Sequence, residues 1–282
     1  MPAIVRTRQQ MSEVSDLLTK SGESLGFVPT MGALHPGHIS LVERAARENR
    51  HVVVSIFVNP IQFNNLEDLR LYPRTLEEDL RLLETTRCEY VFYPEPGEMY
   101  PDEITESYDF GSLGDVLEGK FRPGHFNGVA IVVRRLFDIV KPHRAYFGEK
   151  DFQQLAIVRE MTRMLRLPVE IVPCPTLRDP DGLAMSSRNT RLTAEGRKNA
   201  VFLYQILTQT TLWAQQNSYG QIREYVIEAF RERPEFRLEY FEIADSRTLL
   251  PLSERLPGQE AVALVAAWLE NVRLIDNMRL PA

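Results

Sequence analysis

Short apolar runs separated by amphipathic segments limit the folds that this chain can adopt. The runs are rich in branched or aromatic residues, too short for helices and bounded by turn formers: Leu25–Val28, Val52–Val58, Tyr90–Tyr93 and Val169–Val172. We interpret them as buried parallel strands. Strands that alternate with helices indicate an α/β fold with a doubly wound parallel sheet, which binds its ligand at the carboxyl ends of the strands.

Amphipathic helices are predicted between these strands. The segment Ile39–Ala46 presents one apolar face at helical spacing, and the segment Leu76–Leu83 presents another. Thr75 and Glu78 have the spacing of a capping box, which predicts that the second helix begins there. Two further helices are predicted over Val129–Val140 and Gln153–Leu165.

The pattern changes after residue 175. Two helical segments are followed there by three strand-like ones, in the order Thr193–Gln216, Tyr219–Arg233, Leu238–Ile243, Ala261–Trp268 and Val272–Ile275. The sequence therefore predicts a Rossmann-like domain over residues 1–175 and a smaller carboxyl-terminal α+β domain over residues 176–282, which closes on the first as a lid. The stretches Asn64–Arg74 and Pro94–Glu106 are predicted as loops, either plain exposed connections or lids.

The bulk composition is that of an ordinary globular protein, with 282 residues, 44% apolar, 26% charged and a formal charge of −6. Nucleic-acid binding depends on neutralising many phosphates, so no nucleic-acid partner is expected for an acidic chain without a basic block. The chain has no apolar signal region and no run of roughly 18 apolar residues, so we expect a cytoplasmic protein without a membrane partner. Cys88 and Cys174 follow no metal or redox spacing and are expected to be buried free thiols.

The strongest functional signal lies where the strand Leu25–Val28 runs into the segment Pro29–His38. A strand that leads through a glycine-containing turn into a helix leaves backbone N–H groups pointing outward, with the positive end of the helix dipole behind them. His35 and His38 add donors for phosphate oxygens. The junction therefore predicts a nucleotide triphosphate site; the alternative is a turn with two incidental histidines.

Two signatures in this order resemble one superfamily. His35-Pro36-Gly37-His38 resembles the H-x-G-H signature of the adenylate-forming nucleotidyltransferases, which include the class I aminoacyl-tRNA synthetases. Met185-Ser186-Ser187-Arg188-Asn189 resembles the mobile K-M-S-K-S loop of that superfamily, although Ala184 stands where its first lysine would be. Each string alone is a weak signal, and the pair is a specific one.

Further segments resemble one family within it, the pantothenate synthetases (pantoate–β-alanine ligases). The resemblance covers roughly the first two thirds of the chain and one segment near its end. The similar segments are Phe57–Phe63, Tyr72–Thr75, Phe121–Phe126, Phe147–Gln154, Asp181–Ala184 and Val272–Asn277. Two departures, His143 where the family usually has aspartate and Arg135 where lysine is common, put local contacts in doubt more than the reaction.

The resemblance implies a two-step ligase reaction. (R)-Pantoate attacks ATP to give pantoyl adenylate and pyrophosphate, and β-alanine then displaces AMP to give pantothenate. The resemblance also implies a magnesium requirement, a homodimer and a place in coenzyme A synthesis.

Adenylation requires the protein to stabilise charge on the phosphates. Catalytic roles are expected for His38, His35, Lys150, Ser186, Ser187 and Arg188. Of the thirty-three basic residues only five are lysines, and one of them is Lys150. A compact ammonium can follow a moving phosphate in a way that a planar guanidinium cannot, so Lys150 is expected to bind phosphate. An ordinary ion pair with Glu149 or Asp151 is the alternative. The residues expected to bind ATP are Met31, Gly32, Ala33, Leu34, His35, Pro36, Gly37, His38, Gly148, Glu149, Lys150, Asp151, Leu177, Met185, Ser186, Ser187 and Arg188.

Uncharged amides suit a substrate that brings its own carboxylate and hydroxyl groups. The resemblance implies that Gln62 and Gln154 hold pantoate and that Gln62 also faces β-alanine. The residues expected to bind pantoate or β-alanine are Pro29, Met31, Asn59, Gln62, Tyr72 and Gln154. Glu78 and Asp79 resemble the acidic pair near the family's magnesium, which takes few protein ligands, although Glu78 could merely cap its helix.

Three other functions were weighed against the ligase. A nucleotidyltransferase that moves AMP or CMP onto a phosphate is disfavoured because Gln62 and Gln154 stand where a basic cluster would be needed. A nucleotide sensor without chemistry has little reason to keep the second signature, Met185–Arg188. A tRNA-charging enzyme is disfavoured by the acidic charge and by the lack of an obvious anticodon-binding region.

Overall fold

The computed structural model describes residues 1–20 and 22–281, and the chain forms two compact units. Unit 1 comprises Met1–Phe110, Arg122–Glu149 and Gln154–Pro175. Unit 2 comprises Gly111–Phe121, Lys150–Gln153 and Thr176–Ala282. Two short segments that precede residue 175 in the sequence therefore belong to unit 2. The division into a substrate-binding domain and a lid stays a prediction.

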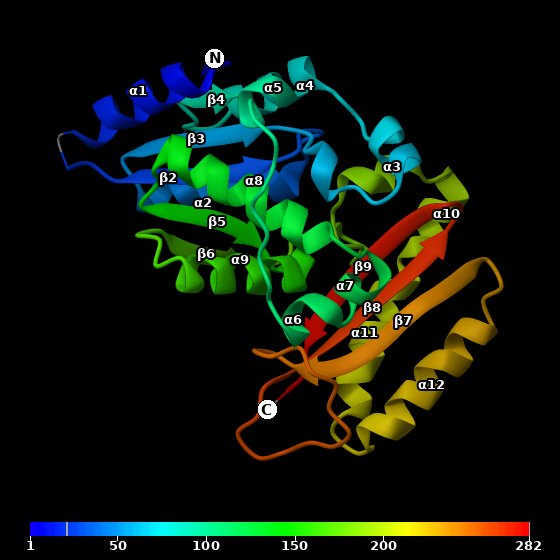
Figure 1. The fold of residues 1–282 in the computed structure, drawn as a ribbon. Helices are drawn as coiled ribbons and strands as arrows, with labels where there is room; N and C mark the ends of the chain where they lie inside the picture. The colour runs from blue at the N-terminus through cyan, green and yellow to red at the C-terminus, as the bar shows by residue number, and fades with distance from the viewer. Residues whose placement is uncertain (21, 282) are drawn as a thin grey trace. The chain divides into compact units, whose positions relative to one another are not determined.

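Unit 1 is built on a six-stranded parallel sheet with the order β1-β4-β3-β2-β5-β6 (Figure 1). The strands are β1 (Ala3–Val5), β2 (Leu25–Thr30), β3 (His51–Ile56), β4 (Tyr90–Phe92), β5 (Arg144–Gly148) and β6 (Glu170–Cys174). The predicted α/β class is confirmed, and the four predicted strands correspond to β2, β3, β4 and β6. Two strands were not predicted: β1, which has only three residues, and β5, whose apolar residues lie between Arg144 and Gly148.

Helices cover both faces of this sheet, because successive side chains on its central strands point to opposite faces and both sets are apolar. On β2, Phe27 belongs to one buried cluster and Val28 to the other. The cluster around Phe27 includes residues of α1 (Arg8–Thr19), α8 (His125–Val140) and α9 (Phe152–Met164). The cluster around Val28 includes residues of α2 (Pro36–Glu48) and α4 (Leu76–Glu84). The remaining helical segments of unit 1 are η1 (Pro60–Gln62), α3 (Leu66–Leu71) and α5 (Pro96–Met99), and the last two lie in stretches predicted as loops.

The strand order reverses beside β2. From β2 the chain passes outward to β3 and β4, and it later adds β5 and β6 on the opposite side of β2. In doubly wound sheets the ligand crevice lies at such a switch point, outside the carboxyl ends of the strands. A ligand is therefore expected at the carboxyl ends of β2 and β5.

The predicted capping box at the start of α4 is wrong, although the helix begins at the expected residue. Thr75 is the N-cap residue, but its side chain makes no capping hydrogen bond. Its hydroxyl instead donates to Asp79 Oδ1 at 3.2 Å, because this buried carboxylate lies one turn further along the helix. Glu78 remains exposed to solvent.

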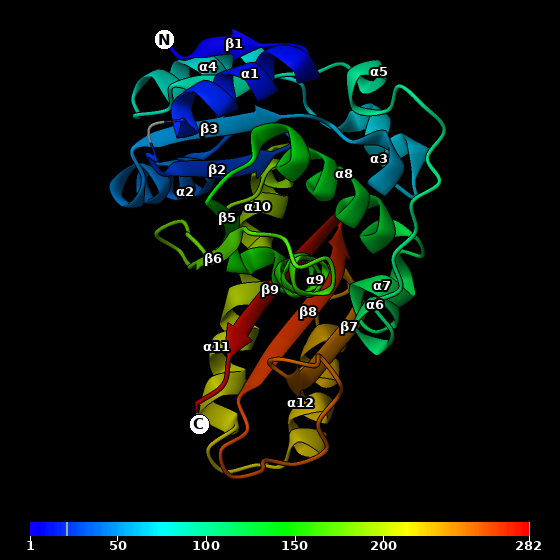
Figure 2. The same ribbon diagram turned by 60° about the vertical axis from the view of Figure 1, so that its left-hand side comes forward.

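Unit 2 contains an antiparallel sheet with the order β7-β8-β9 (Figure 2). The strands are β7 (Phe236–Asp245), β8 (Ala261–Leu269) and β9 (Val272–Arg279). The helical segments are α6 (Ser112–Asp115), α7 (Glu118–Phe121), η2 (Glu149–Asp151), η3 (Ser187–Arg191), α10 (Ala194–Ala200), α11 (Phe202–Trp213) and α12 (Tyr219–Arg231). The predicted α+β character is confirmed.

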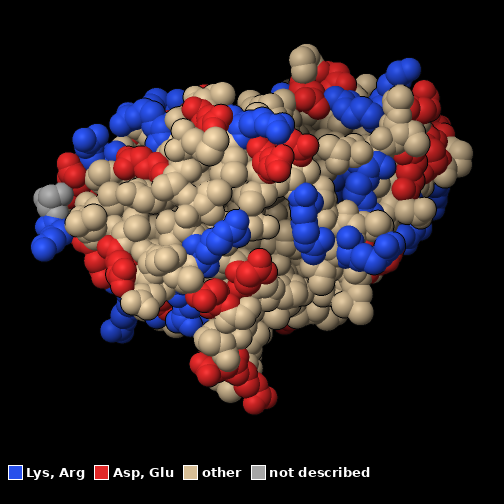
Figure 3. All heavy atoms as spheres, turned by 90° about the horizontal axis from the view of Figure 1, so that it is seen from above, with Lys and Arg blue, Asp and Glu red and all other residues tan. Residues whose placement is uncertain are grey.

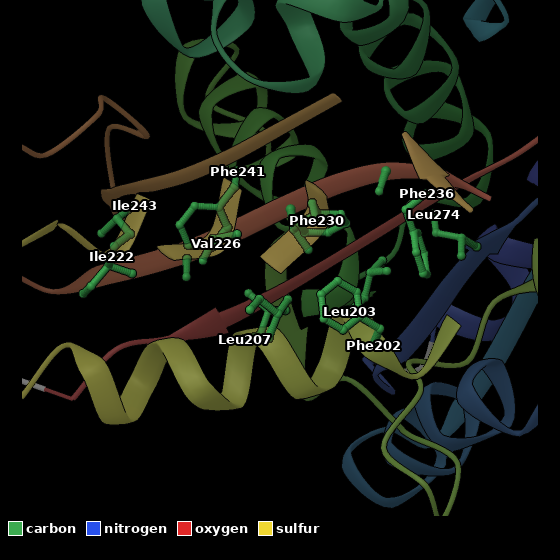
Figure 4. Close-up of a cluster of buried hydrophobic side chains, with 14 of the residues drawn as sticks. Phe202, Leu203, Leu207, Ile222, Val226, Phe230, Phe236, Phe241, Ile243 and Leu274 are labelled. Carbon is green, nitrogen blue, oxygen red and sulfur yellow. The ribbon is translucent and has the colours of Figure 1, made fainter. Parts of the chain in front are cut away.

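The core of unit 2 is formed between its helices and its sheet. Leu203 and Leu207 of α11, Ile222 and Val226 of α12 and Phe241 of β7 belong to one buried cluster, shown in Figure 4. The single helix predicted over Thr193–Gln216 is two helices. The break lies at position 201, where the main-chain N–H bonds three residues back instead of four, in a tighter turn.

Several bulk expectations can be compared with the structure. Cys88 and Cys174 are buried free thiols as predicted, and burial raises the pKa of Cys88 to about 12.

No helix among the described residues is long and apolar enough to cross a membrane. On the face shown in Figure 3, basic and acidic side chains are interspersed. The absence of a nucleic-acid partner stays a prediction.

A histidine at the start of β3 makes the stability of unit 1 depend on pH. His51 Nε2 lies 2.9 Å from Glu23 Oε2, and His51 Nδ1 lies 2.9 Å from Glu89 Oε2. Burial lowers the pKa of His51, but hydrogen bonds and charges from Glu23 and Glu89 outweigh burial and raise the pKa above its usual value. The native state therefore holds this proton more tightly than the unfolded chain does.

We expect this stabilisation to be complete below the unfolded pKa of roughly 6.5 and to be lost as pH rises through the higher native pKa. Between pH 6 and pH 8, the wild type should lose about 1 kcal/mol or less of unfolding free energy relative to His51→Asn, since both carboxylates are more than a third exposed. Urea unfolding of both proteins at the two pH values measures this difference. Equal pH dependence in the two proteins would contradict the assignment.

Candidate active site

The segment after β2 is a tight turn that leads directly into α2. Gly32 has a φ of +78°, and a Cβ at this position would lie 3.0 Å from both Asp79 Oδ2 and Ile56 Cγ2. The positive φ therefore favours glycine here, and the close surroundings leave little room for a Cβ. The Thr30 hydroxyl accepts the Gly32 N–H at 3.1 Å and donates to the Ser55 carbonyl at 2.7 Å. The turn is thus tied to β2 and to the neighbouring strand β3.

A buried carboxylate from α4 fixes the next part of the turn. Asp79 accepts the Ala33 N–H at 3.0 Å and the Leu34 N–H at 2.7 Å, in addition to the Thr75 hydroxyl. Burial raises the pKa of Asp79, and the hydrogen bonds from Leu34 and Ala33 act in the opposite direction. With its side chain almost fully buried and three donors bound, Asp79 holds the main chain of the predicted ATP loop.

The two members of the predicted acidic pair differ in burial, since Asp79 is buried and Glu78 is exposed. The described residues contain no group of three or more histidine, cysteine, aspartate or glutamate side chains that could hold a metal ion. Magnesium typically uses only one or two carboxylates beside phosphate oxygens and water. A magnesium role for these residues therefore stays a prediction, and the observed contacts give Asp79 a supporting role.

The two histidines of the signature cap α2 reciprocally. His35 is the N-cap residue, and its Nδ1 accepts the Gly37 N–H at 3.1 Å. His38 Nδ1 accepts the His35 N–H at 3.3 Å, and the two ring centroids lie 4.0 Å apart. Because Nδ1 is the acceptor in each ring, the proton of each neutral imidazole lies on Nε2. The capping contacts thus orient two Nε2–H donors at the amino end of the helix.

Two of the predicted substrate residues form an amide cluster after β3. Asn59 precedes η1 and Gln62 ends it, and Asn59 Nδ2 donates to Gln62 Oε1 at 3.0 Å. Gln62 Nε2 lies 2.9 Å from Met31 Sδ, so this cluster contacts the turn that follows β2. Both amides are at least nine-tenths buried. The structure therefore brings together Met31, Asn59 and Gln62 at the carboxyl ends of two adjacent strands.

Three residues that support this cluster were missed by the sequence analysis. The Tyr100 hydroxyl donates to Asn59 Oδ1 at 2.6 Å, and the Nδ1–H of His125 donates to the Gln62 carbonyl at 2.8 Å. Gly128 of α8 allows the close approach of η1, since a Cβ there would lie 2.5 Å from the Ile61 carbonyl oxygen. His125 lies in a segment that resembles the family, but nothing in the sequence singles out Tyr100 or Gly128.

The other predicted substrate residues of unit 1 differ in burial and in their surroundings. Tyr72 is buried, and its ring centroid lies 5.8 Å from that of Phe63. Gln154 is half-buried on α9, and Pro29 is half-buried at the end of β2. Gly148 ends β5, and apart from its chain neighbours no described residue has an atom within 4 Å of the position that a Cβ would take. These positions leave the predicted substrate contacts as predictions.

The predicted phosphate residue Lys150 belongs to unit 2. It lies in η2, and its main-chain carbonyl accepts a hydrogen bond from Asn277 Nδ2 of β9 at 2.8 Å. The preceding residue, Glu149, belongs to unit 1, and the following residue, Asp151, is exposed. Gln153 has a structural role, since Nε2 donates to the carbonyls of Leu113 and Val116.

The second signature follows a short hairpin in unit 2. Leu177 accepts the Met185 N–H at 3.0 Å, and Arg178 pairs with Ala184 in an antiparallel bridge. Ala184 is buried, so the position where related loops have their first lysine lies inside unit 2 here. The Ser186 hydroxyl accepts the Arg188 N–H at 3.3 Å and thereby caps η3, which contains Ser187 and Arg188.

The family model for pantoate-beta-alanine ligase matches residues 3–279 of this chain. The chain belongs to the pantoate–β-alanine ligase family. Among its curated relatives, the pantothenate synthetase of Bacteroides fragilis is 48% identical over 276 residues, which cover 98% of this chain and 98% of that protein. The pantothenate synthetase of Christiangramia forsetii is 46% identical over 279 residues and covers 98% of this chain and 99% of its own.

Solved structures of this family are also similar along the whole chain. Pantothenate synthetase from Thermus thermophilus has a TM-score of 0.92 and 47% identity, covering 99% of this chain and 100% of that one. Pantoate-beta-alanine ligase from Francisella tularensis, complexed with beta-gamma ATP and beta-alanine, has a TM-score of 0.81 and 34% identity, covering 99% and 97%.

The predicted resemblance is therefore confirmed, and it extends beyond the first two thirds of the sequence to nearly the whole chain. As a pantoate–β-alanine ligase, the protein is a carbon–nitrogen ligase of pantothenate biosynthesis that uses ATP to condense pantoate with β-alanine. This excludes the sensor, the tRNA-charging enzyme and the phosphate-directed nucleotidyltransferase as its main function.

Proposed function

We propose that this ligase works in two steps through pantoyl adenylate. A pantoate carboxylate oxygen attacks the α-phosphorus of ATP, a new P–O bond forms, and pyrophosphate leaves. The amino group of β-alanine then attacks the acyl carbon, an amide bond forms, and AMP leaves. The observation that carries this proposal is the reciprocal capping of α2 beside the sheet's switch point, in which the Nδ1 atoms of His35 and His38 accept main-chain N–H groups and so leave Nε2 as the donor of each neutral ring.

In the adenylation step, the side chains of His35 and His38 donate to the triphosphate. The main-chain N–H groups of residues 32–35 and 37, which the sequence predicted to point outward, are instead bonded to side chains of the protein, and these bonds fix the conformation of the loop. His38 is the donor whose hydrogen bond strengthens most as charge develops in the transition state. The support that Asp79 gives to Ala33 and Leu34 keeps the loop in one conformation before ATP binds, so little reorganisation is needed.

Pantoate binds beside the amide cluster in this proposal. Gln62 and Gln154 offer amides to its carboxylate and hydroxyl groups, and Pro29, Met31 and Tyr72 form apolar walls. The hydrogen bond from the Tyr100 hydroxyl to Asn59 Oδ1 directs Nδ2 of Asn59 toward Gln62 and so sets the orientation of both amides. Gln62 is also the residue assigned to β-alanine.

Unit 2 supplies the remaining phosphate contacts. Lys150 provides a mobile point charge, and Ser186, Ser187 and Arg188 provide hydroxyl and guanidinium donors without the lysine that other loops carry. Gly148 and Asp151 contact the nucleoside, and Leu177 and Met185 border the same ATP site. Closure of the carboxyl-terminal unit as a lid belongs to this proposal.

Magnesium, when bound, neutralises charge on the triphosphate. The chain's fit to the ion is limited, because Asp79 already accepts three hydrogen bonds and only Glu78 of the acidic pair is exposed. In this proposal Glu78 would hold the ion, and phosphate oxygens and water would supply the other ligands. A homodimer and a cytoplasmic location are proposed from the family resemblance alone, and sedimentation analysis tests the first.

Pyrophosphate exchange tests the two-step reaction. Because adenylation precedes attack by the amine, labelled pyrophosphate should enter ATP when pantoate and magnesium are present and β-alanine is absent. Omission of pantoate is the control and should abolish the exchange. If exchange required β-alanine, the adenylate would not form as a separate intermediate and the two-step proposal would be wrong.

A further inference from the structure

Two adjacent residues of β9 bond to the Lys150 turn and to the hairpin that leads into the second signature. Asp276 and Asn277 lie in a strand that pairs along its whole length with β8, where they stand opposite Val265 and Leu264. Both side chains are more than nine-tenths buried. Burying an aspartate and an asparagine inside a sheet costs free energy unless their polar groups are hydrogen-bonded or paired. Their partners therefore show what these two buried side chains do.

Asp276 holds the hairpin that precedes the second signature. Arg178 donates from Nη1 to Asp276 Oδ2 at 2.7 Å and from Nη2 to Asp276 Oδ1 at 2.9 Å. The same guanidinium donates to the Gly182 carbonyl at 3.1 Å and lies 4.9 Å from the centroid of the Tyr204 ring. A bidentate guanidinium–carboxylate pair fixes orientation as well as distance, so it sets where the hairpin's last residue leads into the signature at Met185.

Asn277 holds the Lys150 turn. Its Nδ2 donates to the Lys150 carbonyl at 2.8 Å, and its own N–H donates to Asp276 Oδ1 at 2.8 Å. The Asn277 carbonyl lies 3.3 Å from Arg178 Nη2, so the two contacts share one hydrogen-bonded network. Lys150 is 27 or more residues from the hairpin in sequence, and β9 is the element of unit 2 to which both are bonded.

We infer that Asp276 and Asn277 are positioning residues for adenylation, which hold the Lys150 turn and the loop Met185–Arg188 to one strand as a single phosphate-binding body. The inference rests on the proposed roles of Lys150 and Ser186–Arg188. A side chain can reach a developing charge only if the main chain that carries it is correctly placed. A misplacement of about 1 Å can lower a rate on the order of 10²-fold.

The test uses Asn277→Ala with Asn217→Ala as a matched control. Asn217 makes the same kind of bond in the same unit, from Nδ2 to the Trp213 carbonyl at 3.1 Å, but this bond stays at the end of one helix instead of joining distant segments. We expect Asn277→Ala to slow single-turnover adenylation at least tenfold while the KM for pantoate changes less than about twofold. Asn217→Ala should leave both quantities unchanged.

A double variant separates positioning from a general loss of structure. If Asn277 acts through Lys150, adding Asn277→Ala to Lys150→Ala should slow adenylation little further, because the group that it positions is already absent. Rate losses that multiply in the double variant, or a single Asn277→Ala variant as fast as wild type, would overturn the inference.

Two other outcomes also test the inference: an Asn277→Ala variant that does not fold, and a Lys150→Ala variant that keeps the wild-type rate. If Asn277→Ala does not fold, Asp276→Asn replaces it in a cycle with Arg188→Ala, and the same non-additivity is expected. If Lys150→Ala is as fast as wild type, the proposed role of Lys150 is wrong, and the inference for its turn falls with it. A slow Lys150→Ala beside a normal Asn277→Ala rejects the positioning role alone.

Discussion

His38→Ala should lower the rate of pantoyl adenylate formation on the order of 10²- to 10³-fold, the usual loss for one preorganised donor to developing charge. The Nδ1 of His38 accepts the His35 N–H, so the ring is fixed with its Nε2–H as the donor. Single-turnover quenching with saturating ATP and pantoate measures the adenylation rate directly. A change below about threefold with normal stability would mean that His38 only caps α2.

The capping role requires its own control, because alanine removes both functions of the ring. Glutamine at the same helix position can accept the N-cap N–H, as Gln221 Oε1 does for Ser218 at 3.0 Å in this chain. His38→Gln should therefore regain thermal stability relative to His38→Ala and yet remain on the order of 10²-fold slow. If glutamine restored the rate together with the stability, capping would explain the whole effect.

Local patterns in the sequence predicted the parts of this protein that depend on neighbouring residues. Buried parallel strands are apolar on both faces, so β2 and β3 stand out as continuous apolar runs. The glycine turn and the histidine pair after β2 carry their signal within ten residues. Strand β5 was missed because its apolar residues are few, and they are buried by clusters on the two faces of the sheet that form only in the folded chain.

Contacts between distant segments could not be predicted in the same way. The resemblance to the family assigned Asp79 to a magnesium site, which stays a prediction. Its observed partners lie 45 and 46 residues away at Leu34 and Ala33, and no sequence pattern predicted them. Tyr100 supports Asn59 from 41 residues away, and nothing in its local sequence marks it. A hydrogen bond of this kind depends on tertiary packing, which a single sequence does not encode as a periodic pattern.

Lys150→Arg should be nearly as damaging to the overall reaction as Lys150→Ala, although it preserves the charge. Because Asn277 holds the Lys150 carbonyl, the main chain of the η2 turn cannot easily shift to suit a longer, planar guanidinium. Steady-state rates with saturating pantoate and β-alanine measure the effect. Lys141→Arg is the matched control, since Lys141 forms an exposed ion pair with Asp16, where arginine should substitute freely.

The outcome decides between a phosphate ligand and a surface ion pair. An exposed pair contributes at most about 1 kcal/mol and tolerates either cation, so under that alternative both arginine variants would behave alike. A lysine that must reach a moving phosphate from a fixed turn depends on its compact ammonium group, and only the Lys150 variant should then be slow. If Lys150→Arg kept more than roughly half of the wild-type rate per active site, the geometric argument for Lys150 would fail and the phosphate contact would have to come from another residue.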